Sequence, residues 1–167
     1  MEKVKILLHE GTDINIKNPK TGRNALDAYI SFYEEEDEDD DIVTQCHPMF
    51  GFLLDNGIDV YAKALGEDLA LSEALRGRMS VDCIKKLILT MKRQNIDLFN
   101  LNYTDTNGKT PLMYSFKYDD NNNTLTKFMI EQGADVNYAS ENPFPETKAH
   151  KLLYVVMPAK RRFSDTF

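Results

Sequence analysis

The sequence predicts an all-α fold in which helical hairpins stack side by side. Three observations lead to this prediction: a seven-residue motif occurs four times, an amphipathic helical pattern precedes each copy, and a glycine or asparagine ends each helix. The copies are HEGTDIN at 9–15, DNGIDVY at 55–61, RQNIDLF at 93–99 and EQGADVN at 131–137. Recurrence with a period of roughly 20–50 residues is typical of repeat architectures.

The spacing of the four motifs sets the predicted repeat boundaries. Their aspartates, Asp13, Asp59, Asp97 and Asp135, are separated by 46, 38 and 38 residues. The first interval is longer by eight residues, which is the length of the acidic run EEEDEDDD at 34–41 within it. An insertion in one repeat explains the difference. We therefore predict a partial repeat at 1–15, followed by repeats at about 16–61, 62–99 and 100–138.

Each motif follows a segment whose apolar residues recur every three or four positions, which places them on one face of a helix. Gly11, Gly57 and Gly133, and Asn95 in the third copy, suit the left-handed residue that ends many helices. The apolar residues of the four segments are Val4, Leu7 and Leu8; Phe50, Leu53 and Leu54; Ile84, Leu87, Ile88 and Met91; and Leu125, Phe128, Met129 and Ile130.

A second element follows two of the motifs and predicts the first helix of each hairpin. It reads TGRNALDAYI at 21–30 and NGKTPLMYSF at 107–116, and GEDLALSEAL at 66–75 is a weaker copy. The glycine supports a tight turn. Asn24 or Thr110 can cap the helix that follows, and Pro111 suits its first turn. The predicted repeat is therefore a turn, a helix, a loop, a second helix and a glycine stop.

The segment NGKTPL, a helix pair and EQGADVN together resemble the ankyrin repeat, whose consensus runs from G-x-T-P-L to G-A-D-V-N over about 33 residues. The likeness covers about 1–138 and is most specific at 105–137. It implies an ankyrin-repeat solenoid of stacked helix-turn-helix units with short β-turn fingers. Asp27 and Met113 stand where the family has histidine, and bulky aromatic residues replace its small alanine pair.

Long, irregular repeats rich in Asn and Asp resemble those of poxvirus ankyrin proteins. This resemblance implies a non-catalytic module that binds a host signalling protein, for example in the NF-κB pathway, in the host cytoplasm. Longer members carry a C-terminal F-box-like segment that recruits a ubiquitin ligase. Residues 140–167 do not resemble that segment, which argues against ligase recruitment. For 139–167 we predict a closing helix followed by a disordered tail.

The chain opens with the second helix of a repeat, which favours a fragment of a longer ankyrin protein. A truncated remnant without independent activity is the alternative to a working binding module. Ankyrin proteins bind partners through their turn tips and inner helices. The resemblance therefore implies that the contact residues are Lys17, Asn18, Lys20, Arg23, Asp27, Tyr29, Tyr103, Asp105, Asn107, Lys109, Met113 and Tyr114.

The composition limits the classes of partner. The net charge is −7, but without the acidic run the chain has 20 basic and 19 acidic residues. No basic face stands out, so we expect no nucleic-acid partner. No apolar run approaches the roughly 20 residues that cross a membrane, so we expect no membrane partner. Cys46 and Cys83 are too few for a disulfide framework, which favours a reduced, intracellular chain.

No residue pattern points to catalysis, a cofactor or a metal. Cys46 and His47 are adjacent, but no second pair stands at the spacing of a zinc site. Motifs for phosphate cradles and hydrolase nucleophiles are absent, so we predict that the protein is not an enzyme. The run at 34–41 has no glycine for a calcium loop. We predict a disordered surface insertion there. Docking of a basic partner or weak binding of divalent cations is the alternative.

Overall fold

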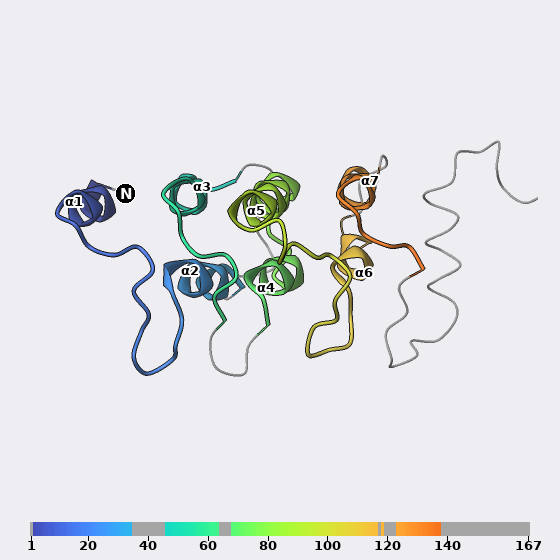
Figure 1. Cartoon of the computed structure of the whole chain (residues 1–167), viewed down its shortest axis with the longest axis horizontal. Helices are drawn as coiled ribbons and strands as arrows, with labels where there is room; N and C mark the ends of the chain where they lie inside the picture. The colour runs from blue at the N-terminus through green and yellow to red at the C-terminus, as the bar shows by residue number, and fades with distance from the viewer. Residues whose placement is uncertain (1, 35–45, 64–67, 117, 119–122, 138–167) are drawn as a thin grey trace, which may run out of the picture. The chain divides into compact units, whose positions relative to one another are not determined.

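The computed structural model describes residues 2–34, 46–63, 68–116, 118 and 123–137 (Figure 1). The chain forms two compact units, unit 1 at Met1–Phe99 and unit 2 at Asn100–Phe167. No strand occurs among the described residues. The acidic run beyond Glu34, and the closing helix and tail predicted at 139–167, lie outside them. The helices are α1 (Glu2–His9), α2 (Ala25–Glu34), α3 (Pro48–Asp55), α4 (Ala70–Arg76), α5 (Val81–Gln94), α6 (Pro111–Ser115) and α7 (Thr124–Glu131).

Unit 1 contains two stacked helical hairpins, α2–α3 and α4–α5. Helices α2 and α4 form one layer, and α3 and α5 form the other (Figure 1). Their apolar faces share one core, as the periodic pattern predicts. The all-α repeat fold is thus confirmed. Helix α1 has no buried residue. The core residues of the hairpins include Leu26, Ile30, Phe50, Leu54, Leu71, Leu75, Ile84, Leu87 and Ile88.

Unit 2 contains the hairpin formed by α6 and α7, which pack against each other. Its core is small: Leu112, Leu125 and Met129 are at most 2% exposed. A hydrogen bond between the buried hydroxyls of Ser115 and Thr126, 2.8 Å apart, also joins the two helices. The hairpin is therefore held by both apolar packing and a buried polar contact.

The helix ends confirm the predicted role of three glycines. Gly11, Gly57 and Gly133 have φ angles of 85°, 84° and 105°, which glycine adopts without steric cost. In this conformation the next residue can donate its N–H to the last helical turn, as Ala134 does to the carbonyl of Met129 at 2.9 Å.

Asn95 behaves differently from the glycines. We expected a left-handed residue, but Asn95 is extended, with a φ of −155°. Helix α4, by contrast, ends with a left-handed residue that is not glycine, Arg78, with a φ of 55°. Met79 then donates its N–H to the carbonyl of Ala74 at 3.1 Å, as after the glycines. Helix α4 therefore ends with the same hydrogen bond as the helices that end at glycine, although its left-handed residue is Arg78 and not glycine.

The predicted caps of α2 and α6 are also confirmed. The Asn24 Oδ1 accepts the backbone N–H groups of Leu26 and Asp27 at 2.9 and 3.0 Å, and the Asp27 carboxylate accepts the N–H of Asn24 at 3.2 Å. This reciprocal pair is a capping box. Thr110 caps α6 by accepting the N–H of Met113 at 3.2 Å, and Pro111 occupies the first turn.

The third motif is shifted from its predicted register. The carboxylates of Asp13, Asp59 and Asp135 each accept the N–H two residues later, at 2.9, 2.9 and 2.8 Å. After α5 the corresponding contact comes from Asn100, which accepts the N–H of Asn102 at 2.7 Å. The equivalence of Asp97 with the other aspartates was therefore wrong. Asn100 takes that place, because extra residues follow α5.

The expectation of free thiols is also wrong. Cys46 and Cys83 form a disulfide, and their Cα atoms are 4.9 Å apart, within the usual range for such a bond. Cys46 lies just before α3, and Cys83 lies in the first turn of α5. The bond thus joins two successive hairpins of unit 1. It also removes the basis for expecting a reduced compartment, and the cytoplasmic location stays a prediction.

Candidate protein-binding surface

The first finger, residues 16–23, connects the segment after α1 to α2 (Figure 1). Asn18 donates its N–H to the carbonyl of Arg23, and Gly22 donates its N–H to the carbonyl of Asn18, both at 2.8 Å. The Asn18 side chain accepts the N–H groups of Lys20 and Thr21 at 2.8 and 3.3 Å. These local bonds fix the turn. The finger is therefore ordered by its own polar groups while its tip stays exposed.

The second finger, residues 103–110, is organised around Asp105. Its carboxylate accepts the N–H groups of Asn107 and Lys109, both at 2.9 Å, and the Tyr114 hydroxyl at 2.6 Å. The Lys109 ammonium lies over the Tyr114 ring, 5.4 Å from its centre. Asp105 and Tyr114 are 7% and 1% exposed. These two residues shape the finger from inside.

Asparagine side chains join the start of each finger segment to the end of the hairpin that follows it. Asn15 accepts the N–H of Asp59 at 2.6 Å and donates to the carbonyl of Gly57 at 3.4 Å. In unit 2 Asn102 makes the same two contacts, with Asp135 at 2.7 Å and Gly133 at 3.1 Å. The repeat pattern alone does not predict this role. The available signal was an asparagine six or seven residues before the glycine of each finger.

Comparisons with known proteins found a short similarity to a curated relative. No protein-family model matches the chain. The chain is 46% identical over 43 residues to the ankyrin repeat protein FPV230 of fowlpox virus (strain NVSL). The match covers 26% of this chain and 22% of that relative.

Over this segment the chain is similar to an ankyrin repeat protein of a poxvirus. Among solved structures it is similar to the ankyrin repeat domain of Bcl-3, a member of the IκB family, at 13% identity. That alignment covers 92% of this chain and 75% of the Bcl-3 chain, with a TM-score of 0.42. Ankyrin repeats are in general a non-enzymatic scaffold for protein–protein binding.

The structure divides the twelve predicted contact residues by exposure. Asp27, Asp105 and Tyr114 are buried: Asp27 caps α2, and Asp105 and Tyr114 organise the second finger. Their role as partner contacts stays a prediction. Residues 17–29 belong to unit 1 and residues 103–114 to unit 2, and each unit presents its own set. Those exposed are Lys17, Asn18, Lys20 and Asn107, and those half-buried are Arg23, Tyr29, Tyr103, Lys109 and Met113.

Two aromatic residues of unit 1 have structural roles beside this surface. The Tyr29 ring stacks on the His47 ring, with centroids 5.8 Å apart. The Tyr61 hydroxyl donates to the carbonyls of Met91 and Asn95 at 2.8 and 3.1 Å. Burial raises the pKa of Tyr61 above its ordinary value of 10.0, so this phenol stays neutral at physiological pH.

A shallow groove of about 320 Å³ lies beside α3, and its lining includes His47, Phe52 and Lys86. An ion pair between Lys86 and Asp55, 2.8 Å long, bridges α5 and α3 there. Within the described part of the chain, no group of three or more His, Cys, Asp or Glu residues is placed to hold a metal ion. The helices in that same part are too short or too polar to cross a membrane.

Proposed function

We propose that the protein is a non-catalytic module that binds a host signalling protein through its fingers and inner helices. The observation that carries this proposal is the first finger. Its turn is held by four local hydrogen bonds, yet Lys17, Asn18 and Lys20 remain exposed. A surface that is ordered before binding loses little conformational entropy when a partner arrives.

The similarity to a fowlpox ankyrin protein supports a host protein as the partner. The proposed location is therefore the cytoplasm of the infected cell. In unit 2 the residues available for contact are Tyr103, Asn107, Lys109 and Met113, because each is exposed or half-buried. The two units contribute separate contact sets, and the proposal requires only that at least one of them binds.

Affinity capture from an avian cell lysate tests this function. The bait is the full chain, compared with the variant Lys17→Ala/Lys20→Ala/Asn107→Ala. The matched control is Lys3→Ala/Lys5→Ala, which removes two exposed lysines from α1. We expect the wild type and the control to enrich the same protein and the finger variant to lose it.

A thermal melt distinguishes two explanations for a failure to capture any protein. If the chain melts cooperatively but enriches nothing over an empty matrix, the binding function is wrong. If helix content instead declines gradually with temperature, the chain does not form a self-sufficient stack, and the truncated remnant without independent activity is the better description.

A further inference from the structure

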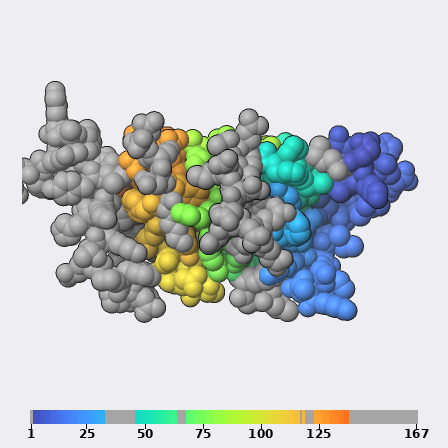
Figure 2. All heavy atoms as spheres, turned by 180° about the vertical axis from the view of Figure 1, so that it is seen from behind, coloured from blue at the N-terminus to red at the C-terminus, as the bar shows by residue number. Residues whose placement is uncertain are grey.

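We propose that one edge of unit 1 binds an acidic protein segment that carries an apolar side chain. The edge consists of the first finger (16–23) and Lys63, and it is called the basic edge below. This inference rests on the proposed binding function and specifies the chemistry of the partner. In the space-filling view, the blue finger projects at the lower border of unit 1 (Figure 2).

The basic edge is a positively charged patch on a chain whose net charge is negative. Lys17, Lys20 and Arg23 lie within the finger, and no acidic residue occurs between Asp13 and Asp27, although the net charge of the chain is −7. Lys17 and Lys20 are exposed and form no ion pair with any described residue. Their charges are therefore available to an anionic partner.

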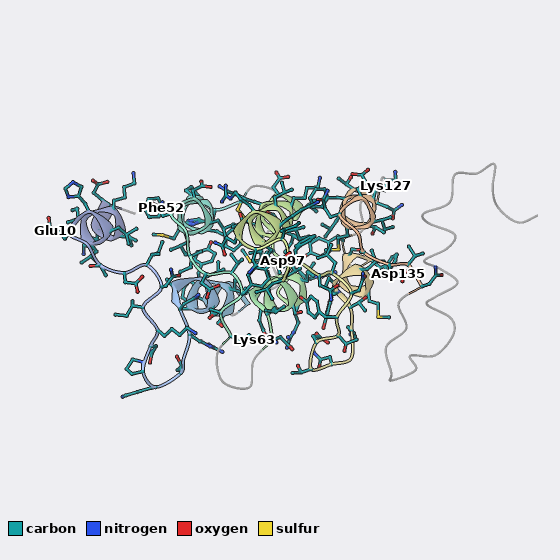
Figure 3. The ribbon with its side chains drawn as sticks, viewed as in Figure 1. Glu10, Phe52, Lys63, Asp97, Lys127 and Asp135 are labelled. Atoms are coloured by element: carbon teal, nitrogen blue, oxygen red, sulfur yellow. A yellow bond between two sulfur atoms is a disulfide. The ribbon has the colours of Figure 1, made fainter. Side chains whose placement is uncertain are left out.

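The repeat register brings a further lysine to the same edge. Lys17 and Lys63 each stand four residues after the turn aspartate of their repeat, Asp13 or Asp59. Asn15 bonds to the backbone of Gly57 and Asp59, so the two segments run side by side. Figure 3 shows Lys63 on the side of α2 and α4 from which the finger projects. The two lysines thus occupy equivalent positions in adjacent repeats.

The aspartates that precede the two lysines in the sequence form local hydrogen bonds. The Asp13 and Asp59 carboxylates each accept the N–H two residues later, at 2.9 Å, which holds them at the start of their segments. They stand four residues before Lys17 and Lys63. An incoming carboxylate interacts favourably with the exposed lysines, with a strength that depends on salt.

The exposure of Ile16 distinguishes between an acidic peptide and a nucleic acid as the anionic partner. Its side chain is 67% exposed and immediately precedes Lys17. A purely acidic segment would leave this apolar surface in water, whereas an apolar side chain on the partner covers it. A nucleic acid would present phosphates to the lysines but no aliphatic group to Ile16. Four basic residues are also few against the overall negative charge. The observations therefore favour an acidic peptide that contains an aliphatic residue.

The test uses fluorescence anisotropy with the full chain and short labelled probes. The first probe is a peptide of Glu and Asp with one central Leu. The others replace Leu by Ser, replace the acids by Lys, or are a single-stranded oligonucleotide. The edge variant Lys17→Glu/Lys20→Glu is compared with Lys3→Glu/Lys5→Glu, which changes the net charge equally on exposed sites of α1. Circular dichroism confirms that each variant keeps its helix content.

We expect the acidic Leu peptide to bind the wild type best, and the edge variant to bind it about tenfold more weakly. We expect the α1 control to stay within about twofold of wild type, because its charges lie outside the edge. Ile16→Ser should remove the preference for Leu over Ser. Raising the salt concentration should weaken binding of the acidic peptide.

Three results would overturn the inference: equal losses in the edge and α1 variants, no binding of the acidic peptide, or tighter binding of the oligonucleotide through the same lysines. Each is separable from failure of the proposed function. If the wild type and the Lys17→Glu/Lys20→Glu variant capture a lysate protein equally well, the binding function stands and only the acidic partner is rejected. A chain that captures nothing loses both.

Discussion

The Asn102 side chain holds the backbone of Asp135, whose N–H it accepts at 2.7 Å, while its own amide donates to the carbonyl of Gly133 at 3.1 Å. Two residues that are 33 positions apart are thus joined by one side chain. Asn15 makes the corresponding pair of bonds in unit 1. In both units this contact connects the start of a finger segment to the end of the following hairpin.

Asn102→Ala removes both bonds, and we expect it to lower the free energy of unfolding by about 1–2 kcal/mol. Urea unfolding followed by circular dichroism measures the change. Asn107→Ala is the matched control, because its exposed side chain belongs to the same finger region without bridging repeats. If the two variants unfold at the same urea concentration, the bridge contributes nothing to stability.

Tyr114→Phe separates a structural from a contact role for this residue. The hydroxyl bonds to the buried Asp105 carboxylate, so its loss should destabilise the protein by about 1–2 kcal/mol. Partner capture should persist at temperatures where the variant is folded. Loss of capture with unchanged stability would restore Tyr114 as a direct contact, against its 1% exposure.

The Cys46–Cys83 bond should stabilise unit 1 by about 2–4 kcal/mol, because it constrains residues 37 positions apart in the unfolded chain. Urea unfolding with and without dithiothreitol measures this contribution. The double variant Cys46→Ser/Cys83→Ser should match the reduced protein and should not respond to the reductant. Alkylation and mass spectrometry verify that dithiothreitol has reduced both thiols. If the wild-type unfolding transition is then unchanged by the reductant, the prediction is contradicted.

Alkaline pH should weaken the fold through Tyr61. Burial raises the pKa of its phenol above 10.0, so the unfolded chain loses this proton at a lower pH than the folded chain. The stabilising contribution is therefore complete below about pH 10 and is lost as the pH rises through the folded pKa. Unfolding experiments between pH 8 and pH 11.5 measure the slope. Tyr61→Phe should be less stable at neutral pH, and its free energy of unfolding should fall less steeply with pH than that of the wild type. If the slope is unchanged, Tyr61 is not the source of the pH dependence.

Much of the fold follows from local chemistry that a sequence displays directly. Gly11, Gly57 and Gly133 end helices because each adopts a positive φ, and Asn24 and Thr110 begin helices because their side chains accept backbone N–H groups. Such roles depend on a few neighbouring residues. These helix starts and ends were therefore predictable before any tertiary contact was known, whereas the ends at Arg78 and Asn95 were not.

Features that depend on distant residues were not predictable in this way. Asp97 matched the motif spacing, but the extra residues after α5 moved the turn to Asn100, and spacing alone could not distinguish the two. Cys46 and Cys83 meet only after two hairpins have stacked. The buried state of Tyr114 follows from its bond to Asp105, whereas its position on an inner helix is equally compatible with display.

The asparagine bridges have a consequence for how such a chain can diversify. Asn15 and Asn102 bond to main-chain atoms, so the junction requires glycine at 57 and 133, where φ is positive, but makes no side-chain contact with Asp59 or Asp135. Mutation can therefore rewrite the outward-facing positions of one module without forcing a matching change in its neighbour. A protein built this way can change its exposed side chains while its architecture stays fixed.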